Sequence, residues 1–467
     1  TDDDGAQSSD TVVVTVTGPG GTTMLSSVSQ WGITWTFDKA YPVGQFVNGD
    51  YWVLGPVVIT SITPAPSGGR NGSMVNPAPG WDHAYDSRLS YGYNASLGVT
   101  LPLTLNPNES LVSTISHDDA PTHTDVQGRE INLGHAYLKT AAVLTCLATA
   151  PPADAFRPPY AGTYKPLYSA GALNTAALPS LAPVASTPAL STYERLFERV
   201  WLDHKAGWTG RLMHPTDNMP NYGREIGGAV GDATLLLCLN FTAQQKQRLH
   251  RLVVQAGIDM YGLARLHKAV WEHGGGHGLG RRWLIVFAGQ SLGEPAFYQM
   301  QDYLSSEDSN TYFADSRGGP WTGWQNSGSP YASTAMWGMW HDLPAGHFPG
   351  GNGSIADHEH VHPSQWGSSP FPVSNQYPYD KFEPYKRICA ISYVGQALAA
   401  RIMGAKDIWN HDAFFAFTDR WMYEDDAAAR AVMLQYWPGY SYSFSPPGGT
   451  AWSTFAGEMW STYREQY

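Results

Sequence analysis

Hydrophobic and polar residues alternate in short runs along the first third of the chain, for example in T-V-V-V-T-V-T, W-G-I-T-W-T-F and V-T-L-P-L-T-L. The runs end near Gly, Pro or Asn, and such spacing is typical of antiparallel strands. The later run A-Y-L-K-T-A-A-V-L-T-C-L fits a strand or a helix by its period, and its β-branched residues favour a strand. We therefore expect an antiparallel, β-sandwich-like domain over residues 11–149, after a disordered polar tail at 1–10.

The hydrophobic period changes in the rest of the chain. Residues 150–190 are rich in Pro, Ala and Ser, which indicates a long connector with little regular structure. Beyond it, stretches such as L-H-R-L-V-V-Q-A-G-I-D-M repeat with the period of a helix. S-T-Y-E at Ser191 and T-A-Q-Q at Thr242 have the spacing of capping boxes and predict two helix starts. The region 191–467 is therefore expected to consist of helical hairpins that pack against one another.

Length and composition agree with two globular domains. The chain has 467 residues, more than one ordinary core accommodates. Aromatic residues make up 13%, including 18 Trp and 26 Tyr, and their flat faces stack well on sugar rings. A large aromatic core is the alternative explanation for this abundance. Only three cysteines occur, far apart in sequence, which argues against a disulfide framework.

The net charge of the chain limits the kinds of molecule that it is expected to bind. The formal net charge of -12 and the lack of a basic cluster argue against nucleic acid. No apolar run is long enough to span a membrane. The chain starts T-D-D-D-G without Met and has few lysines, so we expect a secreted or periplasmic protein whose signal peptide has been removed. Oligomeric state is not predicted.

Candidate chemistry is concentrated in two polar, glycine-rich segments on either side of about two helices of amphipathic sequence. The first segment reads H-P-T-D-N-M-P-N-Y-G-R-E and the second W-E-H-G-G-G-H-G-L-G-R-R-W. Both gather side chains that move protons or bind anions, and loops of this kind on a helical scaffold commonly carry function. Their candidate residues are His214, Asn218, Asn221, Tyr222, Arg224, His273, His277, Arg281 and Arg282.

Residues 191–467, with their helical hairpins, aromatic residues, Asn/Tyr/Arg loop and His-x-x-x-His loop, resemble the (α/α)-toroid polysaccharide lyases. This group includes enzymes that act on alginate and glucuronan. The resemblance lies in architecture and residue types, and those lyases commonly carry their β domain on the C-terminal side, whereas here it comes first. It implies an α+β protein with an α/α toroid, and β-elimination on an acidic polysaccharide.

A uronate lyase must neutralise the C6 carboxylate, remove the C5 proton and protonate the departing O4. In the first segment, Asn218 or Asn221 could bond the carboxylate, and Tyr222 could act as base or acid. Arg224 would supply the cation that lowers a tyrosine pKa, and His214 is assigned to substrate binding. The alternative is a turn before a helix, in which Asn and Asp cap the helix and the tyrosine packs.

The second segment has two histidines four residues apart, but the glycines between them argue against a helical metal site. His273 or His277 is expected to neutralise the carboxylate or act as base, while Arg281 or Arg282 grips a neighbouring uronate. The alternative is a loop with structural histidines before a helix.

Three further regions carry candidates. His358, His360 and His362 alternate, so on a strand they would share one face and could hold a divalent metal such as Zn, Mn or Ca. Direct sugar contact or simple exposure are the alternatives for these histidines, and no other cofactor is expected. Tyr440 could protonate O4 or stack on a sugar. Trp324 and Trp337 are expected to line a sugar groove.

Two rival functions remain. A glycoside hydrolase would use paired carboxylates, for which Glu225, Glu272, Asp357 and Glu359 are candidates. A non-catalytic carbohydrate-binding protein would use the aromatic loops as a groove. No G-x-S-x-G, P-loop or dinucleotide fingerprint after a strand occurs, which argues against serine hydrolases and nucleotide enzymes.

Overall fold

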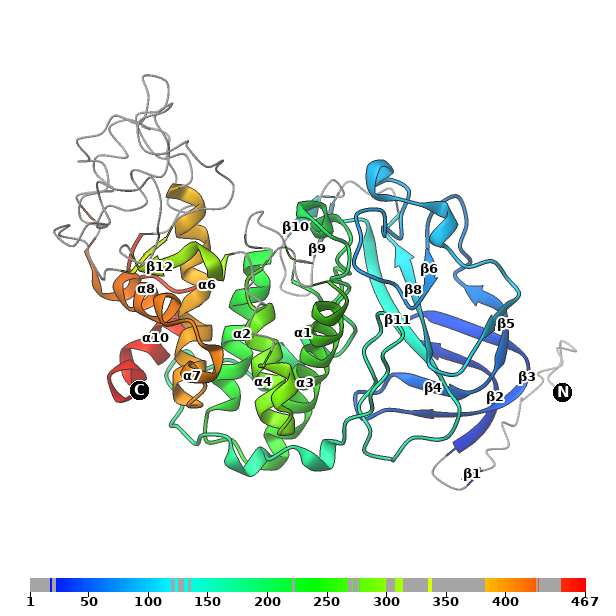
Figure 1. The fold of residues 1–467 in the computed structure, drawn as a ribbon, viewed down its shortest axis with the longest axis horizontal. Helices are drawn as coiled ribbons and strands as arrows, with labels where there is room; N and C mark the ends of the chain where they lie inside the picture. The colour runs from blue at the N-terminus through cyan, green and yellow to red at the C-terminus, as the bar shows by residue number, and fades with distance from the viewer. Residues whose placement is uncertain are drawn as a thin grey trace, which may run out of the picture.

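The chain folds into a β-rich part followed by a helical part that lies directly against it (Figure 1). The computed structural model describes residues 17–18, 22–118, 122–124, 130–132, 136–220, 223–267, 271, 276, 278–299, 307–313, 335–337, 383–425, 427 and 447–467. In Figure 1, α1 and α3 lie nearest the sheet, and α8 and α10 lie at the far end of the helical part.

Among the described residues, nine strands form one sheet. They are β1 (Thr17–Gly18), β2 (Thr22–Gln30), β3 (Ile33–Gln45), β4 (Tyr51–Leu54), β5 (Val57–Thr63), β6 (Ser73–Val75), β7 (Leu103–Leu105), β8 (Glu109–Ser116) and β11 (Leu138–Leu147). The main order is β1-β2-β3-β4-β11-β8-β6, and β5 and β7 extend from β3. The strand expected in A-Y-L-K-T-A-A-V-L-T-C-L is confirmed as β11. The expectation of a purely antiparallel sheet is wrong, because β11 runs parallel to β4.

The long strand β3 makes the sheet fold over itself. Its first half pairs with β5, where Trp35 lies opposite Ile62, and its second half pairs with β4, where Val43 lies opposite Val53. Register shifts interrupt its pairing with both β2 and β5, and such bulges bend a strand. Trp35 is fully buried, and its Nε1 donates to Ser113 Oγ of β8 at 3.0 Å. The fold thereby encloses an apolar core between its two halves.

The helical part consists mainly of α-helices. They are α1 (Leu190–Phe197), α2 (Gly223–Leu237), α3 (Ala243–Leu266), α4 (Arg281–Leu292), α6 (Glu383–Ile402), α7 (Lys406–Trp409), α8 (Asp412–Tyr423) and α10 (Thr454–Tyr463). Two further pairs of short strands are described outside the large sheet. β9 (Thr122–Thr124) pairs with β10 (Glu130–Asn132) in the first third of the chain, and β12 (Thr311–Phe313) pairs with β13 (Ala335–Trp337) between α4 and α6. The 3-10 helices are η1 (Ser90–Gly92), η2 (Ala95–Leu97), η3 (Ala170–Ala172), η4 (Thr175–Ala177), η5 (Trp208–Leu212), η6 (Pro295–Phe297), η7 (Asp308–Asn310) and η10 (Arg464–Gln466).

The expected α/α toroid is wrong for the described helices. In a toroid of hairpins the helices surround a central opening, whereas here α2 occupies the middle and touches α1, α3, α4, α6 and α10. Arg224 is the one residue of α2 that is not buried. α2 consists mainly of small and apolar residues and is buried on nearly every side, as expected for a helix inside a protein. Gly231 lets α6 approach closely, since a Cβ there would lie 2.9 Å from the backbone nitrogen of Gln396.

The two parts share one continuous core. Val112 of β8 and Val143 of β11 join the large apolar cluster that extends through α1 to α10, while Leu144 of β11 faces the core inside the folded sheet. β11 is therefore packed on both faces. The connector 150–190 contributes to this junction, because Phe156 and Tyr160 are fully buried, and it carries η3 and η4.

Of the two capping boxes predicted from the sequence, one is confirmed and the other is wrong. The capping box at Thr242 is present, with Thr242 Oγ1 accepting from Gln245 N and the Gln245 side chain accepting from Thr242 N. The one expected at Ser191 is wrong, since α1 begins at Leu190 after Ala189. The three cysteines are free and buried. No described helix has both the length and the apolar character needed to cross a bilayer.

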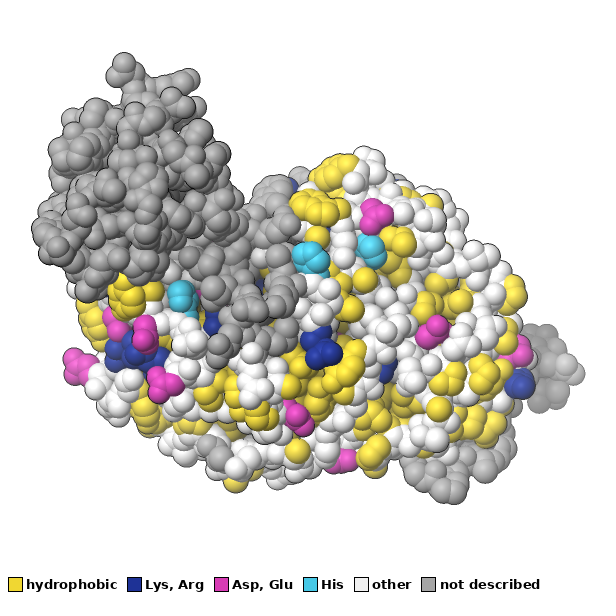
Figure 2. Space-filling view, viewed as in Figure 1, with side chains coloured by type: hydrophobic (Ala, Val, Ile, Leu, Met, Phe, Trp, Pro, Cys, Tyr) yellow, Lys and Arg dark blue, Asp and Glu magenta, His cyan; other side chains and the backbone are white. Residues whose placement is uncertain are grey.

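Basic side chains near the end of the helical part lie beside acidic ones on the face shown in Figure 2. Arg401 and Arg464 both pair with Asp419 at 2.7 Å, and Arg420 pairs with Glu424 at 2.8 Å. These arginines therefore have local partners in the structure.

Asp232, at the centre of α2, should make stability depend on pH. Burial raises the pKa of its carboxyl from 3.8 to about 6, although the Tyr193 hydroxyl (2.6 Å) and the Ser453 hydroxyl (2.9 Å) both donate to it. A carboxyl whose pKa is higher in the folded state than in the unfolded state stabilises the fold fully when the pH is below 3.8. This stabilisation is lost as the pH rises through about 6. We expect a loss of about 3 kcal/mol in the free energy of unfolding over this range.

Asp232→Asn removes the titrating carboxyl, so the free energy of unfolding of this variant should no longer fall between acidic and neutral pH for this reason. Urea unfolding of wild type and variant from acidic to neutral pH measures the difference. Identical pH profiles for the two proteins would show that Asp232 does not titrate as described.

Candidate functional site

The two polar segments singled out in the sequence meet at the N-terminal ends of α2 and α4. Arg281 Nη1 donates to the carbonyl of Gly223 at 3.2 Å. Gly276 has a φ of 93°, and a Cβ there would lie 2.7 Å from the backbone nitrogen of Arg224. A Cβ on Gly280 would similarly lie 2.9 Å from Gly227 Cα. The glycines of the second segment thus allow its backbone to lie against the first segment.

Glu307 holds the second segment in place. Its side chain is fully buried, and its carboxylate accepts from Gly276 N at 3.0 Å and from Gly278 N at 2.5 Å. The Tyr393 hydroxyl of α6 donates to the Glu307 carbonyl at 2.8 Å. Sequence reasoning missed this residue, because nothing in E-D-S-N distinguishes it from a surface turn.

Arg281 and Arg282 were expected to grip a neighbouring uronate, but in the structure both contact other parts of the protein. Arg281 is buried and binds the Asp203 carboxylate through Nε at 2.7 Å and Nη2 at 3.0 Å, while Nη1 also reaches the Leu279 carbonyl at 3.0 Å. Arg282 is also buried, and its Nη2 donates to the Trp409 carbonyl. These contacts suit residues that position the segments, and Asp203 is a partner that the sequence did not reveal.

Three other expected site residues are also enclosed. Asn218 is fully buried, and its Nδ2 donates to the carbonyls of Leu196 at 3.3 Å and Arg199 at 3.0 Å. His214 is buried with Nδ1 2.5 Å from the Arg211 carbonyl. Trp337, expected in a sugar groove, is buried in β13 and donates from Nε1 to the Tyr393 hydroxyl at 3.1 Å.

Arg224 differs from these residues because its side chain stays 22% exposed. Its Nε lies 3.1 Å from Glu225 Oε1, so a carboxylate neighbours the cation in the first turn of α2. Glu225 itself, a candidate for the hydrolase alternative, is buried.

The remaining candidates lie outside the described residues. They are Asn221, Tyr222, Glu272, His273, His277, Trp324, Asp357, His358, Glu359, His360, His362 and Tyr440. Within the described part of the chain, no group of His, Cys, Asp or Glu side chains is arranged to hold a metal ion.

A neutral aromatic cluster lies beside Asp203. The His204 ring centroid is 5.5 Å from that of Tyr85 and 5.6 Å from that of Tyr160, and His204 Nδ1 lies 3.2 Å from the Tyr160 hydroxyl. Burial lowers the pKa of His204 to about 3 and raises the pKa values of both tyrosines well above 10, so all three are uncharged near neutral pH. The Tyr160 hydroxyl also accepts from Asp203 N at 3.1 Å. The cluster therefore supports the segment that binds Arg281.

Comparisons with protein-family models, with curated proteins and with solved structures find no match to this chain. The resemblance to polysaccharide lyases therefore remains a prediction from the residues.

Substitution of Glu307 tests whether its carboxylate holds the second segment in place. Glu307→Ala should lower the free energy of unfolding by about 2–3 kcal/mol, because two buried N–H groups lose their acceptor. Glu307→Gln keeps one acceptor oxygen and should lose less. Denaturation reports the stabilities, and amide exchange at Gly276 and Gly278 should accelerate in the alanine variant. Unchanged exchange there would contradict the assigned role.

Proposed function

We propose that the protein is a polysaccharide lyase that cleaves a uronic-acid-containing polymer by β-elimination. The observation that carries the proposal is the meeting of the two polar segments at the N-terminal ends of α2 and α4. Residues 58 positions apart, Gly223 and Arg281, are joined there by a hydrogen bond. We therefore assign the proton-transfer and anion-binding side chains of both segments to one reaction centre.

The electrostatics of this junction favour an anionic substrate. The N-terminus of a helix carries a partial positive charge, and both α2 and α4 begin here. The partly exposed Arg224 adds a cation in the first turn of α2, and Glu225 Oε1, 3.1 Å from its Nε, offsets part of that charge. Together these groups would stabilise the C6 carboxylate and the enolate-like charge that develops when C5 loses its proton.

The proposed reaction assigns each proton and electron pair. A base, for which Tyr222, His273 and His277 are the candidates, takes the C5 proton. The C5–H electron pair forms the double bond to C4, and O4 departs with the electrons of the C4–O4 bond. Tyr222 or Tyr440 then protonates O4. Arg281, fixed by Asp203, acts as a positioning residue that keeps the two segments together.

The proposal is tested by incubating the protein with alginate, glucuronan, pectate, hyaluronan and heparan. Elimination creates a conjugated, unsaturated uronate, so ultraviolet absorbance should rise on one of these polymers. A parallel assay with EDTA tests whether His358, His360 and His362 hold a required metal. Reducing ends that appear without ultraviolet absorbance would instead support a glycoside hydrolase, and binding without any cleavage would support a carbohydrate-binding protein.

A further inference from the structure

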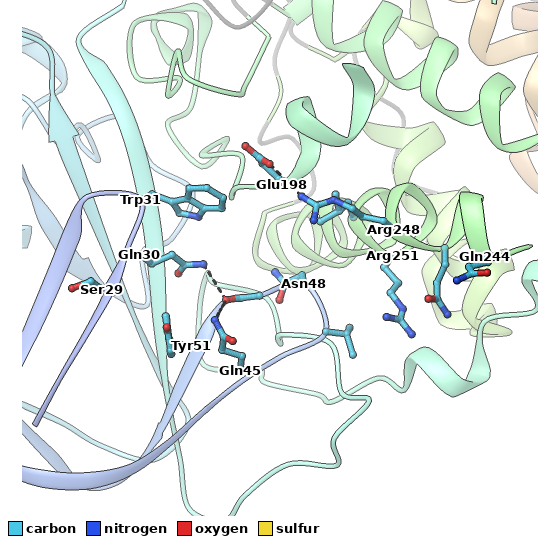
Figure 3. A pocket seen from close by; sticks show the side chains of 14 residues that line it. Ser29, Gln30, Trp31, Gln45, Asn48, Tyr51, Glu198, Gln244, Arg248 and Arg251 are labelled. Carbon is cyan, nitrogen blue, oxygen red and sulfur yellow. Dashed lines mark hydrogen bonds and ion pairs between the residues drawn. The ribbon is translucent and has the colours of Figure 1, made fainter. Parts of the chain in front are cut away.

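A polar cavity of about 580 Å³ lies between the sheet and α3, within the size range of small-molecule sites (Figure 3). One wall comes from the β2–β3 and β3–β4 turns, and the other from the end of α1 and the first half of α3. The predicted site segments contribute no lining residue, so the cavity is separate from the α2/α4 junction.

Trp31 is held in an unfavourable backbone conformation at this cavity. Trp31 and Gly32 connect β2 to β3, and both have positive φ values, 54° and 82°. A two-residue hairpin turn of this kind strongly prefers Asn-Gly, and the left-handed conformation costs a bulky residue about 1–2 kcal/mol. The Arg199 guanidinium lies 4.3 Å from the indole ring, and the indole Nε1 has no acceptor among the described residues. Strain that places an aromatic ring beside a cavity points to a function for that ring.

The wall next to Trp31 is rigid and rich in amides. Gln30 Nε2 donates to Asp50 Oδ1 at 2.9 Å, and Gln45 Nε2 donates to the Gly49 carbonyl at 3.0 Å. Asp50 is bound in turn by the buried Arg157 at 2.5 Å. These bonds organise the wall before any ligand arrives, which lowers the entropic cost of binding.

The opposite wall carries two arginines, of which Arg251 forms no close ion pair among the described residues; its charge acts at longer range on Asp154, where it contributes to lowering the pKa of that carboxyl. Arg248 lies 3.3 Å from both Glu194 and Glu198, so its charge is compensated. Arg251, one turn further along α3, makes no hydrogen bond or ion pair among the described residues. Gln244 and Gln247 extend the same wall at the cavity rim.

We propose that this cavity binds a uronate residue, with its carboxylate on Arg251 and its ring against Trp31. The amides of Gln244 and Gln247 would bond hydroxyl groups, which both donate and accept as amides do. A neutral sugar would leave the Arg251 guanidinium without a direct ion pair, because Asp154 acts on it only at longer range, and a simple inorganic anion would leave the aromatic face unused. The site would retain an acidic glycan without cleaving it, a role beyond the proposed elimination.

Titration with the methyl glycosides of glucuronate and galacturonate, followed by NMR, tests this inference in the full-length protein. These single residues carry no sugar on O4, so their binding is independent of any lyase activity. We expect one of them to shift the Trp31 indole N–H resonance. We also expect methyl glucoside and methyl galactoside, the neutral counterparts, to bind about ten-fold more weakly or not at all, because they lack the charge-assisted bond.

Two variants and a control make the test specific. Arg251→Gln and Trp31→Asn should each weaken binding by about ten-fold or more. Trp31→Asn suits the turn but loses the packing of Trp31 against the core of the sheet, so its melting temperature is measured to show that the variant is folded under the conditions of the titration. Arg195→Gln, an exposed α1 residue outside the cavity, should bind within about two-fold of wild type. Absence of uronate binding, equal binding of the neutral sugars, or wild-type affinity in both cavity variants would overturn the inference.

Discussion

Replacement of Arg157 by methionine is expected to destabilise the folded protein by about 3–5 kcal/mol, because it leaves buried carboxylates without their counter-charge. The Arg157 side chain is fully buried between the sheet and α3. Its Nε binds Asp50 at 2.5 Å, while Nη1 and Nη2 bind Asp259 at 2.9 and 2.6 Å. Asp259 also accepts from Tyr160 N at 3.2 Å, so the network joins both parts of the fold through the connector.

Urea denaturation measures this loss, with Arg248→Met as the matched control. Arg248 also pairs with two carboxylates, but its side chain is 60% exposed, and such pairs contribute about 1 kcal/mol or less. Adding Asp50→Asn and Asp259→Asn to Arg157→Met should recover part of the lost stability, since the uncompensated charges disappear. A loss in Arg157→Met no greater than in Arg248→Met would contradict the account of the junction.

Tyr222→Phe and His273→Ala are each expected to lower the rate of elimination by about 10²–10⁴-fold, the range that a proton-transfer group contributes. Each change removes a group that could take the C5 proton or neutralise the carboxylate. The initial rate of ultraviolet absorbance on the best polymer measures the effect. Tyr91→Phe, at an exposed position of the β-rich part, serves as a control that should keep full activity.

The urea midpoints of unfolding show whether the two variants lose activity because a reacting group is missing or because the fold is destabilised. Both site variants should unfold at the same urea concentration as the wild type. Full activity in both variants would remove Tyr222 and His273 from the mechanism, and activity lost together with stability would assign them a structural role.

Local features of the fold were predictable from sequence because neighbouring residues determine them. The β-branched run that forms β11 and the capping box at Thr242 are of this kind. The parallel pairing of β11 with β4 and the central position of α2 depend on contacts between distant segments, which periodicity does not encode. The small and apolar residues from Ile226 to Leu237, interrupted only by Asp232 and Thr234, were nonetheless a readable sign of a buried helix.

The sequence singled out the two polar segments, but it did not show how they contact each other. The glycines and charged residues of the two segments marked the place where α2 and α4 meet. Motif reading treated Arg281 as free to bind substrate, because the sequence does not show that Asp203, 78 positions earlier, is its partner. Glu307 escaped notice for the same reason. Trp31 was one of many tryptophans until its backbone conformation distinguished it.

The central claim, cleavage by elimination, is tested most directly by digesting the susceptible polymer in water labelled with oxygen-18. Elimination adds no water across the glycosidic bond. The products should therefore be lighter than hydrolysis products by the mass of one water, carry an unsaturated terminal uronate, and incorporate no label during cleavage itself when analysed at once by mass spectrometry. Saturated products that carry the label at the new end would show hydrolysis and contradict the account.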